Sequence, residues 1–323
     1  MKKKRHYSFR EGSPLTFCEA IRNGKIFELL IKGEIPERFR SLKKIVEYNR
    51  KFFFRKILKT PPLNSNPKAT ISIHSLVCQQ DLEMYLLAIK SFLRFHDNIA
   101  VYAHSDGSLD SHDISILKKH IQNISVITRE NSLWNEFLEL IQKDYIDKGI
   151  GNIILMKLFF SQFSNQKKII ILDTDIIFLK KPKILIEWIK EDLDCSFYNQ
   201  DRYDTLRDAE ERIKEDFKLN ELPINFNAGF IALYNDISLA EIKKFLQIQE
   251  KYKDTQITKG DQTIYHLMLA NRNAKPLNRK KYVIYDGKNY THKTVMIHFP
   301  NQNRFDNNIY LMLARQVCKE LKK

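Results

Sequence analysis

Glycine is scarce in this 323-residue chain. Nine glycines are present, well below the usual share of roughly 7%, and neither a GxGxxG nor a GxxxxGK[ST] motif occurs. Those motifs hold phosphates on closely approaching backbone amides, so Rossmann-type dinucleotide binding and P-loop chemistry are not expected. If this protein handles phosphates, we expect it to use a metal ion and side chains.

Clustered cysteines and long apolar runs are also lacking. The four cysteines, Cys18, Cys78, Cys195 and Cys318, are far apart and form no CxxC pair, so we interpret them as reduced thiols. No apolar run approaches the roughly 18 residues of a membrane span. The basic N-terminus is not followed by the apolar segment of a secretory signal. We therefore expect a cytoplasmic protein.

Positive charge is concentrated near the N-terminus. The formal net charge is +15; residues 1–60 contain 17 Lys and Arg and six Glu, a balance of +11, which leaves +4 for residues 61–323. The Pro- and Asn-rich stretch 60–67 is interpreted as a linker or turn. We therefore expect a basic helical arm over residues 1–60 and a catalytic domain over residues 61–323.

The arm has the pattern of a basic amphipathic helix. Residues 38–59 hold nine Lys and Arg and one acid, Glu47. Apolar residues recur there at helical spacing: Leu42, Ile45, Val46, Phe53 and Ile57. Such a helix is expected to bind an anionic membrane surface, peripherally on the inner leaflet. Alternatively, its apolar stripe packs on the back of the catalytic domain, and both interpretations stay open.

From residue 69 onward, strand and helix patterns alternate. Strands are expected over residues 69–78, 98–104, 125–128, 169–172, 226–234 and 295–299. Helices are expected over residues 82–95, 111–121, 133–163 and 261–269, and the charged stretch 201–221 predicts an exposed helix or flap. This alternation implies βαβ units, so the predicted fold is α/β, with a mixed, mainly parallel sheet flanked by helices.

Two aspartates follow the most apolar of these strands. Asp173 and Asp175 come directly after the run Ile169–Leu172. Side chains alternate along a strand, so the two carboxylates point the same way and repel each other unless a cation lies between them. Ligands of open α/β sheets bind at these carboxyl ends. The pair is therefore a candidate site for Mg²⁺ or Mn²⁺, which prefer oxygen ligands.

Two other interpretations of the aspartates are open. They can be solvated acids at a strand end, or they can supply the aspartyl nucleophile of a haloacid-dehalogenase-type phosphatase. The phosphatase pattern requires Thr or Val two residues after the second aspartate and a position near the start of the domain. Here Ile177 stands there, and about a hundred residues of the domain come first. The metal interpretation is preferred.

Four segments in a fixed order resemble a known group of enzymes. They are residues 168–182 with the two aspartates, Phe226–Phe230 (FNAGF), Gly260–Gln262 (GDQ) and Ile297–Phe299 (IHF). They resemble the motifs of GT-A-fold glycosyltransferases, most closely the retaining glycosyltransferase family eight that includes glycogenin and bacterial galactosyltransferases. The resemblance covers roughly residues 69–305. It implies a GT-A-like fold and transfer of a hexose, with retention, from a UDP-sugar to a hydroxyl of a glycan or lipid-linked acceptor.

The resemblance assigns the metal ligands. It implies that Asp173, Asp175 and His298 hold Mn²⁺ or Mg²⁺ on the donor diphosphate, whose growing charge a metal neutralises. Carboxylates with an imidazole suit Mn²⁺ somewhat better than Mg²⁺. Taken alone, His298 would be interpreted as a hydrogen-bonded buried histidine. Beside the two aspartates, the metal role is preferred.

Five further residues would contact the donor according to the resemblance. Lys157 would add positive charge at the donor. Asn227 would hydrogen-bond the donor sugar, with Gly229 permitting close backbone approach. Asp261 would bind sugar hydroxyls and Gln262 would lie at the anomeric carbon. The plainer alternatives are a solvated lysine, a turn at a strand end and an acid favoured at a helix N-terminus.

The remaining assignments rest on position. His74 and Ser75, at the end of the first strand of the catalytic domain, are expected to line the nucleotide pocket, and Asp106, after the second strand, to contact base or ribose. After His298 stands Phe-Pro-Asn-Gln-Asn-Arg instead of the family's Gly-rich run ending in Lys-Pro-Trp. Arg304 is therefore the candidate cation for the diphosphate at this end of the chain.

Two competing functions are open. A metal-dependent nucleotidyltransferase or phosphatase can use a similar sheet. A nucleic-acid-binding protein can combine the basic arm with an inactive transferase-like body, but no RNP motif and no zinc-ligand spacing occurs, so nucleic-acid binding is not expected. We predict a cytoplasmic, metal-dependent hexosyltransferase that acts in glycan or cell-surface polysaccharide synthesis.

Overall fold

The computed structural model describes most of the predicted catalytic domain. It covers residues 55–145, 153–191, 193–202, 210–219, 221–234, 237–251, 261–270, 272–287, 289–300 and 309–323. Most of the predicted arm and Arg304 lie outside these ranges. Within them, none of the helices combines the length and the apolar character that crossing a bilayer requires. The cysteines in the same ranges form no disulfide.

A seven-stranded sheet forms the centre of the fold, in the order β10-β8-β9-β6-β2-β3-β5. Its strands are β2 (Ile71–Val77), β3 (Ala100–Ser105), β5 (Ser125–Ile127), β6 (Lys168–Leu172), β8 (Ser196–Gln200), β9 (Phe226–Tyr234) and β10 (Ala274–Pro276). β9 is antiparallel to both of its neighbours, and every other pairing in the sheet is parallel. The predicted mixed, mainly parallel sheet is confirmed.

Two small sheets adjoin the central one. β7 (Ile176–Phe178) pairs antiparallel with β12 (Met296–His298), which pairs parallel with β11 (Tyr282–Ile284). β1 (Leu63–Asn64) pairs with β4 (Ile121–Gln122). Because β7 follows β6 after a short turn, the β7–β12 pair brings a late segment of the chain beside the two aspartates.

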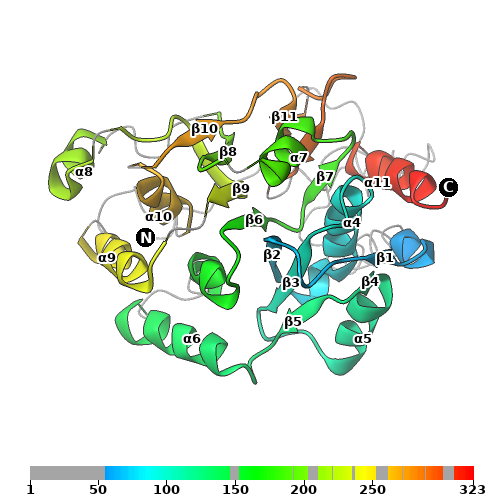
Figure 1. The fold of residues 1–323 in the computed structure, drawn as a ribbon, viewed down its shortest axis with the longest axis horizontal. Coiled ribbons are helices and arrows are strands. Elements are labelled where there is room, and N and C mark those ends of the chain that lie inside the picture. Colours follow the sequence, from blue (N-terminus) through cyan, green and yellow to red (C-terminus); the bar gives the residue numbers. More distant parts are fainter. Residues whose placement is uncertain are drawn as a thin grey trace, which may run out of the picture.

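Helices cover both faces of the central sheet. They are α4 (Leu82–Leu93), α5 (Ser111–His120), α6 (Ser132–Tyr145), α7 (Lys183–Lys190), α8 (Glu210–Phe217), α9 (Leu239–Lys251), α10 (Asp261–Met268) and α11 (Ile309–Glu320), with the three-ten helices η2 (Arg55–Lys59), η3 (Gln79–Asp81) and η5 (Ile153–Phe163). α8, α9 and α10 gather at the left of Figure 1, and α4 and α11 at the right.

β6 shows why the sequence folds into these layers. Side chains alternate along a strand, and Ile170 packs into the core shared with α4, whereas Ile169 and Ile171 pack into the core shared with α10. The four residues from Ile169 to Leu172 are at most 1% exposed. A strand covered on both faces needs an unbroken apolar run, which is the pattern that predicted it.

The end of the predicted arm packs against the core of the α/β fold. Ile57 of η2 is buried in the core that contains α4. Lys90 Nζ donates a hydrogen bond of 2.6 Å to Thr60 Oγ1, and Thr60 is buried. The stretch 60–67, interpreted as a linker or turn, is therefore anchored to the domain at its first residue. Of the helix predicted over residues 38–59, residues 55–59 form η2 and residues 38–54 lie outside the described residues. The domain boundary at residue 60 stays a prediction.

Candidate active site

The carboxyl ends of the parallel strands meet at one edge of the central sheet. β6 leads into Asp173 and Asp175, β3 into Asp106, and β2 into η3, which ends at Asp81. β9 runs the other way and brings its first residues to the same edge, where Asp173 N donates to Gly229 O at 2.8 Å. Open α/β sheets bind their ligands at this edge.

Asp173, Asp175 and His298 lie together at this edge. One ligand atom from each lies within 4.8 Å of the others. His298 Nε2 is 3.2 Å from Asp175 Oδ1 and 3.9 Å from Asp173 Oδ2. The β7–β12 register sets this arrangement, since His298 pairs with Ile176 and Phe299 N donates to Asp175 O at 3.1 Å. The structure thus brings together the three residues that the sequence predicts as metal ligands.

The chemistry of this cluster fits a divalent cation. Two carboxylates and one imidazole offer oxygen and nitrogen donors, a set that suits Mn²⁺ and, less closely, Mg²⁺. His298 is 3% exposed, and its Nδ1 has no hydrogen-bond partner among the described residues. Packing therefore holds the ring with Nε2 toward the carboxylates. These residues fit a metal ion of the predicted kind.

Gly229 provides the space that the His298 ring occupies. A Cβ atom at Gly229 would lie 2.2 Å from His298 Cε1 and 2.9 Å from its Nε2. These separations are well inside the roughly 3.5–4.0 Å of favourable carbon contacts. Any other residue at this position would push the imidazole away. The role of Gly229 beside the donor stays a prediction. In the structure, the missing side chain of Gly229 leaves room for the imidazole of His298.

Lys157 connects two carboxylates. Its Nζ, on η5, is 2.6 Å from Asp173 Oδ1 and 3.0 Å from Asp261 Oδ2. Tyr265 on α10 donates its hydroxyl to Lys157 O at 2.6 Å, which ties η5 to α10. Burial lowers the pKa of Lys157, but the two carboxylates outweigh burial and the pKa is raised. Lys157 is 8% exposed, so its interpretation as a solvated lysine is wrong.

The charges in the cluster shift one another's protonation. Burial raises the pKa of Asp173; the Lys157 ammonium opposes this shift and the Asp175 carboxylate adds to it. Burial lowers the pKa of His298, but the carboxylates of Asp175 and Asp173 outweigh burial and the pKa is raised. The cluster therefore favours positive charge, whether it comes from Lys157, a protonated His298 or a bound ion.

Asn227 and Gln262 are positioned by hydrogen bonds around the start of β9. Asn227 Oδ1 accepts from Gly229 N at 3.0 Å, and its Nδ2 donates to Asp201 Oδ2 at 3.4 Å. Gln262 Nε2 donates to the backbone carbonyl of the first β9 residue at 3.0 Å. Asp261, which begins α10, is held by Lys157. Asp201 follows β8 at the same edge and is a site residue that the sequence analysis missed.

His74 and Ser75 lie inside β2. The strand continues to Val77, and both side chains are at most 1% exposed. His74 Nδ1 is 3.0 Å from His104 Nε2, and His74 Nε2 is 2.8 Å from Ser72 Oγ. Burial lowers the pKa of His74 to about 3. His74 and Ser75 are therefore not at the end of the strand, the position on which their assignment to the nucleotide pocket rested. The imidazoles of His74 and His104 form a neutral pair in the core.

Asp106 follows β3, as expected, and is held in a turn. Its Oδ1 accepts from Ser108 N at 2.9 Å and from Ser108 Oγ at 2.6 Å. The turn needs Gly107, whose φ of 99° favours glycine. Asp81 at the end of η3 accepts from Thr174 Oγ1 at 3.5 Å. It was missed because, unlike Asp106, it does not directly follow its strand but ends the short helix η3 that comes after β2.

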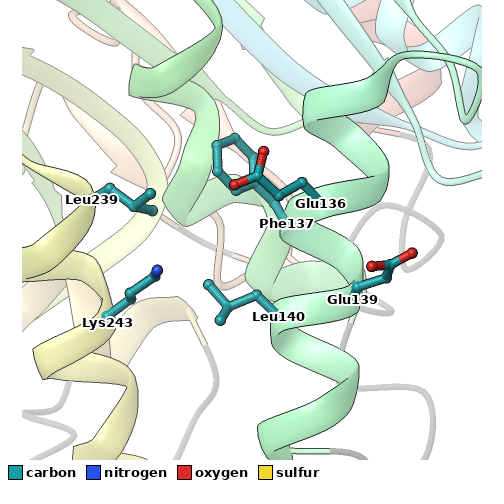
Figure 2. Close-up of a pocket in the computed structure, with 6 residues that line it drawn as sticks. All are labelled: Glu136, Phe137, Glu139, Leu140, Leu239 and Lys243. Atoms are coloured by element: carbon teal, nitrogen blue, oxygen red, sulfur yellow. The ribbon is translucent and has the colours of Figure 1, made fainter.

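A separate pocket of about 200 Å³ lies between α6 and α9. Its lining residues are Glu136, Phe137, Glu139, Leu140, Leu239 and Lys243. Figure 2 shows Leu140 of α6 and Leu239 of α9 pointing toward each other, whereas Glu139 points away. None of the lining residues belongs to the acidic cluster. The candidate active site is therefore the cluster at the sheet edge.

Solved structures of glycosyltransferases have a similar fold. Mouse xyloside xylosyltransferase 1 matches with a TM-score of 0.52 and 12% identity, over 75% of this chain and 99% of that one. The galactosyltransferase LgtC, solved with donor and acceptor sugar analogs, matches with a TM-score of 0.53 and 14% identity, over 78% and 96%. The chain has a GT-A-like fold.

The third comparison extends over more of this chain. The mannosyltransferase Ktr4p from S. cerevisiae matches with a TM-score of 0.50 and 15% identity, over 86% of this chain and 92% of that one. No protein-family model and no curated protein matches the sequence. At these identities the likeness confirms the predicted GT-A-like fold class, and membership of glycosyltransferase family eight stays a prediction.

Proposed function

We propose that this protein is a metal-dependent glycosyltransferase that moves a hexose from a nucleotide sugar to a hydroxyl acceptor. The observation that carries the proposal is the meeting of Asp173, Asp175 and His298 with the charged Lys157 at the ligand-binding edge of a GT-A-like sheet. The galactosyltransferase LgtC, which has a similar fold, was solved with donor and acceptor sugar analogs. That supports a sugar donor and a sugar acceptor here.

The charges of the site suit a departing nucleoside diphosphate. Asp173, Asp175 and His298 would hold Mn²⁺ or Mg²⁺, and a bound ion supplies a Lewis acid for the charge that grows on the diphosphate. Lys157 adds a fixed positive charge, because its ammonium is already seated between two carboxylates. Arg304 is proposed as a further cation for the same diphosphate.

The remaining site residues would position the donor, proposed to be a UDP-hexose. Asn227 and Asp261 bind hydroxyls of the sugar, Gln262 lies at the anomeric carbon, and Asp106 contacts the nucleoside. Asp261 is held by Lys157 at 3.0 Å, so it is not poised as the base that an inverting transferase needs to deprotonate its acceptor. This arrangement favours transfer with retention of configuration.

The acceptor is proposed to be a glycan or a lipid-linked glycan, in glycan or cell-surface polysaccharide synthesis in the cytoplasm. The basic helix predicted over residues 38–59 would hold the enzyme on the inner membrane surface, where lipid-linked acceptors are available. Deleting residues 1–54, which leaves the packed Ile57 and Thr60 in place, should then weaken sedimentation with anionic vesicles while the domain stays soluble. Aggregation of the truncated chain would instead favour packing of the arm on the domain.

A thermal-shift screen tests the donor class. A ligand that binds only the native state, present at 100 times its Kd, adds about 2.7 kcal/mol of stability. A UDP-hexose should raise the melting temperature in Mn²⁺ and much less in EDTA, and the Asp175→Asn variant should lose this difference. A shift caused by nucleoside triphosphates but by none of the nucleotide sugars would contradict the proposal and indicate a nucleotidyltransferase.

Turnover tests the metal. Losing a Lewis-acid site costs several kcal/mol, so the Asp175→Ala variant should lose roughly 10²-fold to 10⁴-fold in kcat. EDTA should have the same effect on the wild type, reversibly. The matched control is Asp194→Ala, at an exposed aspartate outside the cluster. Full turnover of the Asp175 variant in EDTA would rule out a metal-dependent reaction.

A further inference from the structure

Three loops at one end of the β7–β12 pair join into a single basic surface. They are residues 179–183, 278–281 and 291–295. Leu179 N donates to Val295 O at 2.7 Å, and Val295 N donates to Lys281 O at 2.7 Å. We name this surface the lysine patch. It consists of Lys180, Lys181, Lys183, Arg279, Lys280, Lys281 and Lys293, all exposed.

The charge of the lysine patch is not balanced locally. Its three loops contain seven Lys and Arg and no Asp or Glu. Residues 61–323 carry +4 in total, so subtracting the patch leaves −3 for the rest of the domain. Among the elements packed beside the loops, α7 contributes the carboxylate of Glu187, which acts on Tyr282 of β11. Such clustering of like charge repels itself and favours an anionic partner.

An exposed apolar side chain adjoins the patch. Ile184 follows Lys183 in the first turn of α7 and is 39% exposed, whereas its neighbours Leu185 and Ile186 are buried. Lysines around an exposed aliphatic side chain match a bilayer surface, because the lysines meet anionic head groups and the aliphatic group enters the interface. The three loops contain no Phe, Tyr or Trp, the residues on which single-stranded nucleic acids stack.

We propose that the lysine patch binds an anionic lipid surface. In the β7–β12 pair, His298 stands opposite Ile176 at one end and Met296 opposite Phe178 at the other, where the patch begins. The patch is therefore about 10 Å along the strands from the candidate active site, at roughly 3.3 Å per residue. Docking through the patch would leave the site uncovered beside the membrane. The proposal concerns the domain itself, separately from residues 38–59, and does not rest on the proposed catalytic activity.

Vesicle sedimentation of the full-length chain tests the patch. The test variant is Lys280→Glu/Lys281→Glu/Lys293→Glu, and the matched control is Lys118→Glu/Lys119→Glu/Lys244→Glu, on exposed lysines of α5 and α9. Both lower the net charge from +15 by six. A basic residue near an anionic leaflet is worth about fivefold in partitioning (about 1 kcal/mol), so the test variant should bind phosphatidylglycerol-containing vesicles at least about 10²-fold more weakly.

The control defines what overturns the proposal. The control variant should stay within about threefold of the wild type, since its lysines lie outside the patch. Equal weakening in both variants, or no weakening in either, would overturn the proposal. So would a test variant that loses binding to a single-stranded RNA while keeping its vesicle binding. Melting temperatures check folding, and Lys→Gln versions at the same positions replace any charge-reversal variant that unfolds.

A second measurement needs no charge change. In the Ile184→Trp variant, anionic vesicles should shift the indole emission to shorter wavelength, and lipids brominated on their chains should quench it. The native Trp134 and Trp188 are both 0% exposed, so they provide a constant background. An emission spectrum that anionic vesicles leave unchanged would show that Ile184 does not enter the interface and would overturn the proposed orientation.

Discussion

The Lys157 ammonium holds one oxygen of Asp173, the carboxylate that begins the acidic pair. Nζ is 2.6 Å from Asp173 Oδ1, whereas Oδ2 of the same group faces His298 Nε2 at 3.9 Å. A divalent ion at this carboxylate would therefore bind beside a fixed ammonium that repels it. A donor diphosphate carries negative charge and would offset that repulsion, so metal and donor should bind more tightly together than apart.

Replacing Lys157 separates these effects. The Lys157→Met variant should bind Mn²⁺ about tenfold more tightly in the absence of donor, a gain of about 1.4 kcal/mol, because the competing ammonium is gone. The same variant should lose turnover, since the departing diphosphate loses a positive charge. Mn²⁺ electron paramagnetic resonance measures the affinity, with the exposed-site variant Lys118→Met as control. An unchanged Mn²⁺ affinity would contradict the competition.

The contact between Gly229 and His298 can be tested by a double-mutant cycle. Gly229→Ala places a methyl group 2.2 Å from His298 Cε1, so it should destabilise the fold by about 2 kcal/mol, within the range of overpacked cores. It should also weaken Mn²⁺ binding, because the ring must move. In a His298→Ala background, the destabilisation by Gly229→Ala should largely disappear. Urea unfolding measures all four proteins, and an equal cost in both backgrounds would contradict the contact.

The buried His74–His104 pair should make the fold sensitive to acid. Burial lowers the pKa of His74 to about 3, and burial together with His74 lowers that of His104 well below its usual value. An unfolded imidazole takes up a proton below about pH 6.5, whereas the folded pair does not, so stability falls as pH drops below that value. Between pH 7 and pH 5 the loss should be about 2 kcal/mol for each imidazole.

Urea midpoints at the two pH values check this dependence. The His74→Gln variant should lose about 2 kcal/mol of the difference between pH 7 and pH 5, which is the contribution of one imidazole, whereas His120, whose pKa burial also lowers, keeps its own contribution. His112→Gln, at an exposed position on α5, serves as the control and should keep the full difference. A His74 variant with the pH dependence of the wild type would show that the pair is not its source.

The stereochemistry of transfer tests the roles of Asp261 and Gln262. Lys157 holds Asp261 at 3.0 Å, and the Gln262 amide donates to a backbone carbonyl of β9. Asp261 is paired with an ammonium and Gln262 carries no carboxylate, so neither is poised as a base, and a UDP-α-hexose should give an α-linked product. Proton NMR of the fresh product distinguishes the two anomers by their coupling. A β-linkage would contradict retention and require a base elsewhere.

β2 and β6 show how far the sequence could predict the fold. Both strands are covered on both faces and both were predicted. Burial of that kind leaves a continuous hydrophobic signal in β6, whereas in β2 the polar residues Ser72, His74 and Ser75 interrupt the apolar pattern. Several other elements were not predicted: β1, β4, β7, β8, β10, β11, α7, α9 and α11. β7 is three residues long and depends on its pairing with β12, far away in the sequence. The local pattern of apolar and polar residues does not reveal a pairing between strands that are far apart in the sequence.

The candidate site likewise has parts that a local sequence pattern predicts and parts that depend on tertiary packing. Asp173 and Asp175 were identifiable because a strand end fixes their direction. The motif resemblance added His298, but the simultaneous contact of Lys157 with Asp173 and Asp261 depends on how η5 packs on α10. His74 was misplaced because a polar residue within a strand was taken for its end, whereas stacking on Tyr102 at 4.6 Å satisfies it in the core.

The pairing of β7 with β12 has a consequence for folding. His298 comes 125 residues after Asp173, and bringing the ends of a loop of that length together costs about 4 kcal/mol of chain entropy, apart from a constant. An ion shared by the two residues would act as a reversible cross-link across that loop. Refolding of the C-terminal part should then depend on free metal concentration. A chain that stops before Met296 would lack the histidine that completes the cross-link.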